Sequence, residues 1–201
     1  MKRLQRTIFL LLAAVVALSP AAAAQTATFQ IDTQHSSAQF SARHLLISTV
    51  RGNFHNVTGT VYLDEKDITK SRVEATIDTT TIDTREPKRD AHLKSADFLD
   101  VANFPTMTFQ STKVEKAGEG KLRVTGDLTI RGVTKPVVLE VEGPTPEIKD
   151  PWGNTRRGAT ARTKINRFDY GVSWDKTFDA GGLVVGETVE ITIDLEMIKK
   201  G

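Results

Sequence analysis

Alternation of apolar and polar residues, repeated along most of the chain, is the feature that most limits how this sequence can fold. In the segment 121–130, Leu122, Val124, Leu128 and Ile130 lie on one side of the alternation, and Arg123 lies on the other. Successive side chains of a strand point to opposite faces, so a period of two predicts antiparallel strands with one buried face. The sequence therefore favours an all-β fold.

Eight segments share this pattern, and each is expected to be a strand with one apolar face. Eight antiparallel strands can form two sheets or one closed barrel, and closure removes exposed strand edges. We therefore expect an eight-stranded antiparallel closed barrel, whose interior would admit side chains or one slender ligand. The expected inward faces are Ala38, Phe40, Ala42 and His44; Val57, Gly59, Val61 and Leu63; Val73, Ala75 and Ile77; Met107 and Phe109; Leu122, Val124, Gly126, Leu128 and Ile130; Val137, Leu139 and Val141; Ala159, Ala161, Thr163 and Ile165; and Val189, Ile191, Ile193 and Leu195.

Two segments depart from the strand pattern. In the first, Pro87 suits the first turn of a helix, and Leu93, Ala96 and Leu99 follow at helical spacing. We expect one short helix from Pro87 to Leu99, lying across one end of the barrel as a plug or lid. The second segment, 143–158, is rich in Pro and Gly and is expected to be a long irregular connection.

Residues 1–24 are typical of a secretory signal peptide. Basic residues precede an apolar run from Ile8 to Leu18, and Ala22 and Ala24 suit cleavage before Gln25. The apolar run is shorter than the ~20 residues that span a bilayer, so we expect a cleaved signal and a product that is not membrane-embedded. The sequence thus predicts a periplasmic protein whose mature part, 25–201, is a single domain.

Charge and cysteine content exclude several classes of function. The chain has 27 Lys and Arg and 25 Asp and Glu. Three of the basic residues belong to the expected signal peptide, so the mature part carries 24 minus 25, or about −1. Nucleic-acid binding requires a basic face, so no nucleic-acid partner is expected. The absence of cysteine excludes disulfides, thiolate nucleophiles and thiolate metal sites.

A series of short motifs follows the expected strands in order between Phe29 and Ile198. They are Asp32-Thr33-Gln34-His35-Ser36, Arg43-His44-Leu45, Val50-Arg51-Gly52-Asn53-Phe54, Ile82-Asp83-Thr84, Arg89-Asp90-Ala91-His92-Leu93-Lys94-Ser95-Ala96-Asp97-Phe98-Leu99-Asp100, Phe104-Pro105, Phe109-Gln110-Ser111, Gly126-Asp127-Leu128-Thr129-Ile130-Arg131-Gly132-Val133-Thr134-Lys135-Pro136-Val137 and Asn166-Arg167-Phe168-Asp169-Tyr170-Gly171. Together they resemble the YceI-like family of lipocalin-like, polyisoprenoid-binding periplasmic proteins.

This resemblance implies an extended eight-stranded barrel that holds a polyisoprenoid or similar long-chain amphiphile. It also implies a periplasmic location, frequent dimers and no established catalytic residues. Three positions depart from the usual family pattern. They are Leu99 and Tyr170, where Phe is usual, and the turn 85–88, where a Gly-Asn type of turn is common.

The inward faces predict which residues line a lipid cavity. Burying each methylene of a ligand contributes about 0.8 kcal/mol, so an apolar interior suits a long chain. His44 is either a core histidine with a protein partner or a contact for a ligand headgroup. The expected lining residues are Phe40, His44, Phe54, Ile77, Met107, Phe109, Leu128, Ile130, Ile165 and Trp174.

Arg89, His92, Leu93 and Arg167 are candidates for contacts with a headgroup or for a gate. On a helix, Arg89 and His92 share a face while Asp90 points elsewhere, so these three cannot converge on one reacting group. A capped and salt-bridged helix that fixes the lid is the favoured interpretation. Arg167 is expected to pair with Asp32 or with a phosphate headgroup, since bidentate geometry suits either partner.

Motifs for catalysis are missing from the sequence. It contains no Gly-x-Ser-x-Gly elbow and no nucleotide-binding glycine pattern, and its four histidines lack the spacing of metal ligands. No catalytic residue, metal or cofactor is therefore expected. We predict a protein that binds, carries or sequesters a polyisoprenoid or fatty-chain lipid. The alternatives are an enzyme acting on such a lipid and a scaffold for a membrane redox partner, and a homodimer is left open.

Overall fold

The computed structural model describes residues 26–179 and 181–201, so the predicted signal peptide lies outside the described part. This part contains eleven strands, one α-helix and three short 3₁₀ helices. The helices are η1 (Ile68–Lys70), η2 (Thr79–Thr81), α1 (Pro87–Lys94) and η3 (Arg167–Tyr170). The strands are β1 (Thr26–Ile31), β2 (Ser37–His44), β3 (Ser48–Phe54), β4 (Val57–Asp64), β5 (Arg72–Asp78), β6 (Thr106–Gly118), β7 (Lys121–Ile130), β8 (Val133–Glu142), β9 (Ile148–Lys149), β10 (Thr155–Asn166) and β11 (Val185–Lys199).

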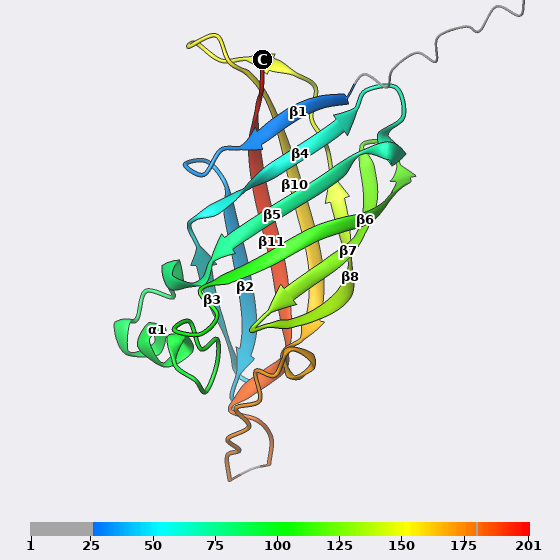
Figure 1. The fold of residues 1–201 in the computed structure, drawn as a ribbon. Coiled ribbons are helices and arrows are strands. Elements are labelled where there is room, and N and C mark those ends of the chain that lie inside the picture. Colours follow the sequence, from blue (N-terminus) through cyan, green and yellow to red (C-terminus); the bar gives the residue numbers. More distant parts are fainter. Residues whose placement is uncertain (1–25, 180) are drawn as a thin grey trace, which may run out of the picture.

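Eight of the described strands form a closed antiparallel ring, which confirms the predicted barrel (Figure 1). The order around the ring is β11, β1, β4, β5, β6, β7, β8 and β10, and β10 pairs with β11 to close it. Closure depends on the long strand β11. Along residues 188–198 one edge of β11 pairs with β10. Its other edge is divided between β2, at 185–194, and β1, at 197–199.

Membership of the ring differs from the expected set of eight strands. β1 belongs to the ring although no strand was predicted there. The predicted strand at 38–44, which is β2, instead forms a hairpin with β3 and extends the wall on the α1 side of β1. The cause is that β11 is long enough to accept both β1 and β2 along one edge. Alternation within a segment carries no information about which strand edge it will occupy.

The interior of the barrel follows the alternation predicted from the sequence. On β7, Val124, Leu128 and Ile130 are buried, whereas Arg123 and Asp127, which alternate with them, are exposed. Two glycines, one on β7 and one on β3, allow aromatic rings to lie close against the backbone of a neighbouring strand. A Cβ atom on Gly126 would lie 2.4 Å from Cζ of Phe109, and one on Gly52 would lie 2.5 Å from Cζ of Phe40. Glycine at both positions therefore leaves room for these rings.

The single α-helix of the described part is shorter than predicted. It begins at Pro87 as expected, with the Glu86 side chain accepting a hydrogen bond from the Lys88 amide, but it ends at Lys94 rather than Leu99. The Ser95 hydroxyl donates to the His92 carbonyl at 2.7 Å, and such local side-chain bonds favour turns over further helix. The chain then folds back, and the Leu99 amide donates to the Leu93 carbonyl.

The predicted irregular connection at 143–158 is wrong in part. It contains the two-residue strand β9, and β10 begins within it at Thr155. β9 pairs antiparallel with β10, with Lys149 opposite Thr155, a pairing that alternation over two residues cannot reveal. Among the described residues no helix is both long and apolar enough to cross a bilayer.

Candidate ligand-binding cavity

An apolar cavity with a volume of about 270 Å³ lies inside the barrel. At one end it is bounded by Leu63 and Met197, and at the other by Leu93 and Val172. Its lining residues on β11 extend from 185 to 197, which is about 40 Å of strand at roughly 3.3 Å per residue. The cavity axis is shorter because barrel strands are tilted. The shape is narrow and long, and suits an extended apolar chain.

The structure brings eight of the ten predicted lining residues into the wall of this cavity. They are Phe40, Phe54, Ile77, Met107, Phe109, Leu128, Ile130 and Ile165. His44 and Trp174 do not line the cavity and instead line a groove outside it. His44 is the last residue of β2, and at this position the strand extends beyond the end of the cavity.

This groove forms a mouth beside α1, and we refer to it as the mouth groove. It shares Phe40, Ala42, Leu93, Phe98 and Val185 with the lining of the cavity, so the two spaces adjoin. The predicted gate residues Arg89, His92 and Leu93 all line it. The full set of its residues is Phe40, Ala42, Arg43, His44, Val50, Glu86, Lys88, Arg89, His92, Leu93, Phe98, Trp174, Val184 and Val185.

His92 lies against two aromatic rings at the mouth groove. Its ring centroid is 5.0 Å from that of Phe98 and 5.5 Å from that of Trp174, and both pairs meet edge to face. Its Nε2 atom lies 2.9 Å from a carboxylate oxygen of Asp97. Trp174 comes from the segment after η3, so this aromatic cluster joins α1 to a distant part of the chain.

Arg89 and Asp90 fix the start of α1 to one buried threonine. Arg89 donates from Nε to the Thr84 hydroxyl at 2.7 Å and from Nη2 to the Thr84 carbonyl at 2.8 Å. Asp90 accepts from the Thr84 amide and hydroxyl. The expected capped helix is therefore present, but Arg89 is held by hydrogen bonds to Thr84 and makes no ion pair with the described residues.

Arg167 lies in η3 and lines the cavity at the α1 end. Of the two partners that the sequence left open for Arg167, Asp32 or a phosphate headgroup, Asp32 is wrong. The guanidinium donates to three backbone carbonyls, those of Val172 at 2.6 Å, Val185 at 3.0 Å and Gly186 at 3.1 Å. It makes no ion pair with the described residues, and only 5% of the residue is exposed. Burial lowers its pKa, against the opposing charges of Asp175 and Glu187.

Tyr170 is a cavity residue that the sequence analysis did not include. Only 2% of it is exposed, and its hydroxyl has no hydrogen-bond partner among the described residues. Burial, with a smaller contribution from the charge of Asp169, raises its pKa to about 12. The available signal was its departure from the family pattern, but the direction of the side chain depends on the geometry of η3.

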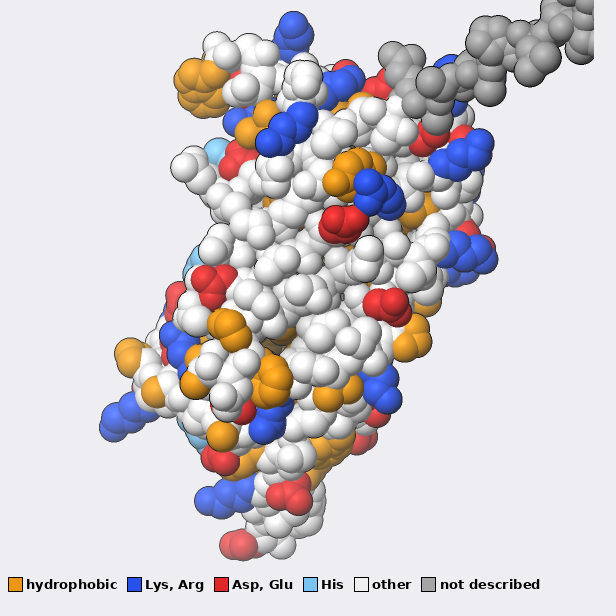
Figure 2. Space-filling view, viewed as in Figure 1, with side chains coloured by type: hydrophobic (Ala, Val, Ile, Leu, Met, Phe, Trp, Pro, Cys, Tyr) orange, Lys and Arg blue, Asp and Glu red, His pale blue; other side chains and the backbone are white. Residues whose placement is uncertain are grey.

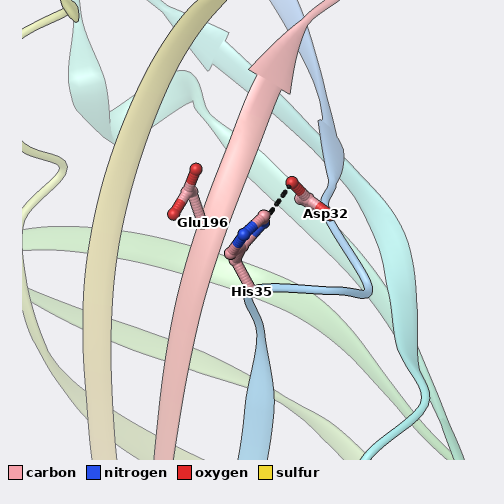
Figure 3. Close-up of side chains that lie close together, drawn as sticks. All are labelled: Asp32, His35 and Glu196. Atoms are coloured by element: carbon pink, nitrogen blue, oxygen red, sulfur yellow. Dashed lines mark hydrogen bonds and ion pairs between the residues drawn. The ribbon is translucent and has the colours of Figure 1, made fainter. Parts of the chain in front are cut away.

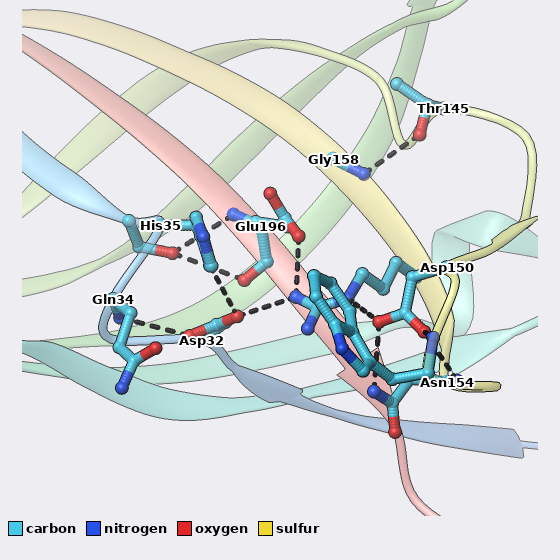
Figure 4. Close-up of polar contacts among 11 residues, drawn as sticks. Asp32, Gln34, His35, Thr145, Asp150, Asn154, Gly158 and Glu196 are labelled. Atoms are coloured by element: carbon cyan, nitrogen blue, oxygen red, sulfur yellow. Dashed lines mark hydrogen bonds and ion pairs between the residues drawn. The ribbon is translucent and has the colours of Figure 1, made fainter.

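Asp32 is bound instead in a network at the opposite end of β10. Arg156 Nη1 lies 2.6 Å from both Asp32 and Glu196, and Arg156 Nε lies 2.5 Å from Asp150. Burial raises the pKa of Asp32, but hydrogen bonds from Arg156 and His35 outweigh it and lower the pKa to about 2. Figure 4 shows how this network ties the turn at Gln34 and His35 to the loop at Asp150 and Asn154.

Within this network lies the one group of described residues whose atoms are spaced like metal ligands. Asp32, His35 and Glu196 lie within 4.8 Å of one another, with His35 between the two carboxylates (Figure 3). Both carboxylates already contact the Arg156 guanidinium. A metal ion would have to compete with this cation, so the arrangement is better explained as an ion-pair network that stabilises the loops.

The face of the molecule shown in Figure 2 carries charges of both signs. Figure 2 shows basic and acidic side chains scattered together over the face in view. Several ion pairs join neighbouring strands on the outside, such as Lys164 with Glu190 and Arg123 with Glu140. The apolar interior is therefore the feature that distinguishes this barrel chemically.

Comparisons with known proteins agree with this geometry. The family model described as a YceI-like domain matches residues 29–197. The chain is 43% identical over 159 residues to the YceI protein of Escherichia coli O157:H7, covering 77% of this chain and 81% of that protein. A solved structure of the Campylobacter jejuni YCEI protein is similar, with a TM-score of 0.67, 30% identity and coverage of 79% of this chain and 90% of that one.

A second solved structure shares the fold at much lower identity. It is a polyisoprenoid binding domain from Saccharophagus degradans, with a TM-score of 0.63 and 14% identity. The match covers 86% of this chain and 98% of that domain.

Proposed function

The chain belongs to the YceI-like family, and from that premise we propose that it binds a polyisoprenoid or similar long-chain lipid inside its barrel and carries or sequesters it in the periplasm. The observation that supports this proposal is the continuous apolar cavity with a mouth groove beside α1. A long guest that fills it gains about 0.8 kcal/mol per buried methylene. The polyisoprenoid-binding neighbour with the same fold suggests the class of ligand.

Mass spectrometry of an organic extract of the purified protein tests this proposal. We expect a long-chain lipid to be recovered with the wild type. Ala161→Phe places a bulky ring in the cavity and should abolish recovery, whereas Arg162→Phe on the outside of the same strand should not. Equal recovery from both variants would place the lipid outside the barrel and overturn the proposal.

Two other functions would give different results in the same preparation. Chemical conversion of added lipid would indicate an enzyme, and a barrel free of lipid would favour a scaffold for a membrane partner. Absence of any bound lipid in the wild type would therefore contradict the binding role. Light scattering on the same sample measures whether the chain forms the homodimer that the family resemblance implies.

The proposed location rests on the signal-like residues 1–24. Cell fractionation should recover the protein from the periplasm, and N-terminal sequencing should give Gln25 as the first residue. A membrane-bound product that still begins with Met1 would overturn this part of the proposal and leave the binding role untouched.

A further inference from the structure

Two consecutive apolar side chains are exposed to solvent in the turn between β2 and β3. Leu46 is 61% exposed and Ile47 is 79% exposed. The other large apolar side chains that are exposed in the described part are Val138, Ile148 and Trp152. Single exposed apolar residues need no explanation, whereas contiguous ones indicate a surface that contacts something. We refer to residues 45–47 as the apolar tip.

The backbone of the apolar tip shows that forming this turn does not require leucine. The Ile47 amide donates to the His44 carbonyl at 3.1 Å, and the two residues between them, Leu45 and Leu46, have φ angles of 51° and 64°. Asn and Gly are the usual residues at both positions of such a turn, because a leucine is strained there. Asn-Gly would form the same turn with less strain and without exposing apolar surface. Strain that is retained in this way points to a function.

The apolar tip is continuous with the mouth groove. Figure 1 shows the turn between β2 and β3 at the same end of the barrel as α1 and the segment after η3. The Leu45 amide donates to the carbonyl of Val184 at 2.9 Å, and Val184 lines the groove together with His44. The groove in turn shares Phe40 and Ala42 with the cavity. Apolar surface therefore extends from the tip through the groove to the cavity.

Arg43 holds the apolar tip in place and puts a positive charge beside it. Its guanidinium donates from Nη2 to the Leu46 carbonyl at 2.6 Å and from Nη1 to the Thr49 hydroxyl at 2.9 Å. A turn that is already held by such bonds loses little conformational entropy when it binds. Arg43 and Lys88 are exposed and line the mouth groove, whose acidic lining residue is Glu86. Cations beside an apolar tip suit the headgroups of an anionic bilayer.

The size of the apolar tip favours a bilayer over a protein as its partner. A stable protein interface needs about 800 Å² and roughly 20 residues from each partner, which a three-residue tip does not supply. A bilayer requires less, because a few apolar side chains that enter the boundary between headgroups and acyl chains give reversible binding, which nearby basic residues strengthen. Reversible binding is also what a lipid carrier needs in order to leave the membrane again.

Building on the proposed lipid-binding function, we propose that the apolar tip docks the barrel on an anionic phospholipid bilayer, with Leu46 and Ile47 inserted among the lipids and the mouth groove facing the membrane. The guest lipid then passes between bilayer and cavity along the groove without crossing water. Each methylene that a transfer through water exposes disfavours that path about 4-fold, so docking shortens the slowest part of the exchange.

Flotation with vesicles of phosphatidylethanolamine and phosphatidylglycerol tests the docking. Leu46→Gly combined with Ile47→Ser removes both side chains, and glycine tolerates the positive φ at 46. The affinity for vesicles should fall about 10-fold or more. The control Trp152→Ser removes a side chain that is 80% exposed in the Asp150 loop, at the opposite end of the barrel, and should change the affinity less than about 2-fold. An equal loss in both proteins, or a loss in Trp152→Ser alone, would overturn the proposal.

Several outcomes separate the docking from the proposed function. The vesicles contain no isoprenoid, and binding of geranylgeraniol to the delipidated protein is measured without vesicles. The double variant should bind geranylgeraniol as the wild type does, since neither residue lines the cavity. A wild type that binds geranylgeraniol but does not float would overturn the docking and leave lipid binding intact, whereas the reverse result would contradict the proposed function. Loss of a dimer in the double variant, with no flotation of the wild type, would show that a second copy covers the tip.

A fluorescent label measures directly which end of the barrel enters the bilayer. The chain contains no cysteine, so a single introduced one takes the label. A polarity-sensitive fluorophore on Ile47→Cys should emit at shorter wavelength when vesicles are added, and lipids brominated on their acyl chains should quench it. The same label on Ile148→Cys, at the opposite end, should show neither effect. No change at Ile47→Cys, or the same change at both positions, would show that the apolar tip does not insert.

Discussion

Arg156 and Arg167 lie at opposite ends of β10, and both are nearly excluded from solvent, but their surroundings differ. Arg156 contacts three carboxylates, those of Asp32, Asp150 and Glu196. Arg167 contacts three backbone carbonyls and faces the cavity. A buried cation paired with carboxylates is compensated by opposite charge and holds loops together, whereas a cation bound only by backbone carbonyls is compensated by dipoles and fixes the backbone that supplies them. The first end is therefore held together by charge pairs between loops, and the second by a cation that binds the backbone of β11 and of the segment after η3.

The largest effect is expected from removing Arg167. Arg167→Met removes a donor from the carbonyls of Val172, Val185 and Gly186, and each unsatisfied buried group costs about 1 to 3 kcal/mol. The free energy of unfolding in urea should fall by about 3 kcal/mol or more. Arg162→Met, which breaks an exposed pair with Glu142, should change it by less than about 0.5 kcal/mol. Similar small changes in both variants would show that Arg167 does not hold η3.

At the other end, acid should weaken the Asp32 network. The folded-state pKa of Asp32 lies near 2, below its ordinary value of 3.8, so its contribution to stability is complete above about pH 4 and is lost as the pH falls toward 2. We expect a loss of roughly 2 kcal/mol across this interval. Asp32→Asn should lose a similar amount at neutral pH and show a shallower decline in acid.

The matched control for Asp32 is Asp127→Asn, which changes an exposed carboxylate on the outside of β7. It should leave the acid profile of the free energy of unfolding as in the wild type. If Asp32→Asn also leaves the acid profile unaltered, other carboxylates control the stability in acid, and the ion-pair network around Arg156 contributes little to it.

Gly126 lies in the barrel wall between the two ends, and enlarging it tests whether the space inside the wall limits how much lipid the barrel holds. In Gly126→Ala the new Cβ atom would lie 2.4 Å from Cζ of Phe109 and 2.5 Å from the backbone oxygen of Gln110, so the ring has to turn and β6 has to shift. We expect a cost of about 1 to 3 kcal/mol from overpacking, together with less lipid in the organic extract. Gly158→Ala, where the nearest atom lies at 3.5 Å, should keep both values near the wild type. Full lipid content in Gly126→Ala would contradict a ligand path past Phe109.

The sequence predicted the wall of the barrel better than its ends. Alternation identifies inward residues such as Leu128 and Ile130 because the period of a strand is fixed by its own backbone. It cannot show that β11 would share one edge between β1 and β2, since that depends on strand length and on partners far away in the chain. For the same reason the sequence offered Asp32 as one of two possible partners of Arg167, whereas Asp32 pairs with Arg156, which is 124 residues away along the chain.

Arg167 and Tyr170, the two buried residues of η3, illustrate the same limit more closely. The motif around Asn166 and Gly171 marked the region, but period-two reasoning would put Arg167 and Asp169 on one face. In the structure the chain turns into a 3₁₀ helix there, so Arg167 shares a side with Tyr170 instead. A change of local period over four residues is therefore enough to bring Tyr170 into the cavity wall and to leave Asp169 exposed.

The smallest effects on stability, and the sharpest on kinetics, are expected at α1, which lines the mouth groove beside the cavity. Helix α1 contains no buried residue, so it should open more readily than the barrel wall and exchange its amide hydrogens faster than β7 or β11. Leu93→Ala and Arg89→Ala should loosen it further and speed both uptake and release of lipid. Ala91→Gly, which costs about 1 kcal/mol of helix propensity without changing a groove residue, should do the same.

These variants decide whether α1 is a gate or only a structural cap. Release is measured by transfer of bound lipid to excess vesicles, and opening by hydrogen exchange of the amides in 87–94. A gate requires that faster exchange in this segment be accompanied by faster release, in Ala91→Gly as well as in Leu93→Ala. If exchange accelerates while release stays at the wild-type rate, lipid passes by another route, and the cluster of His92, Phe98 and Trp174 serves only to hold the helix in place.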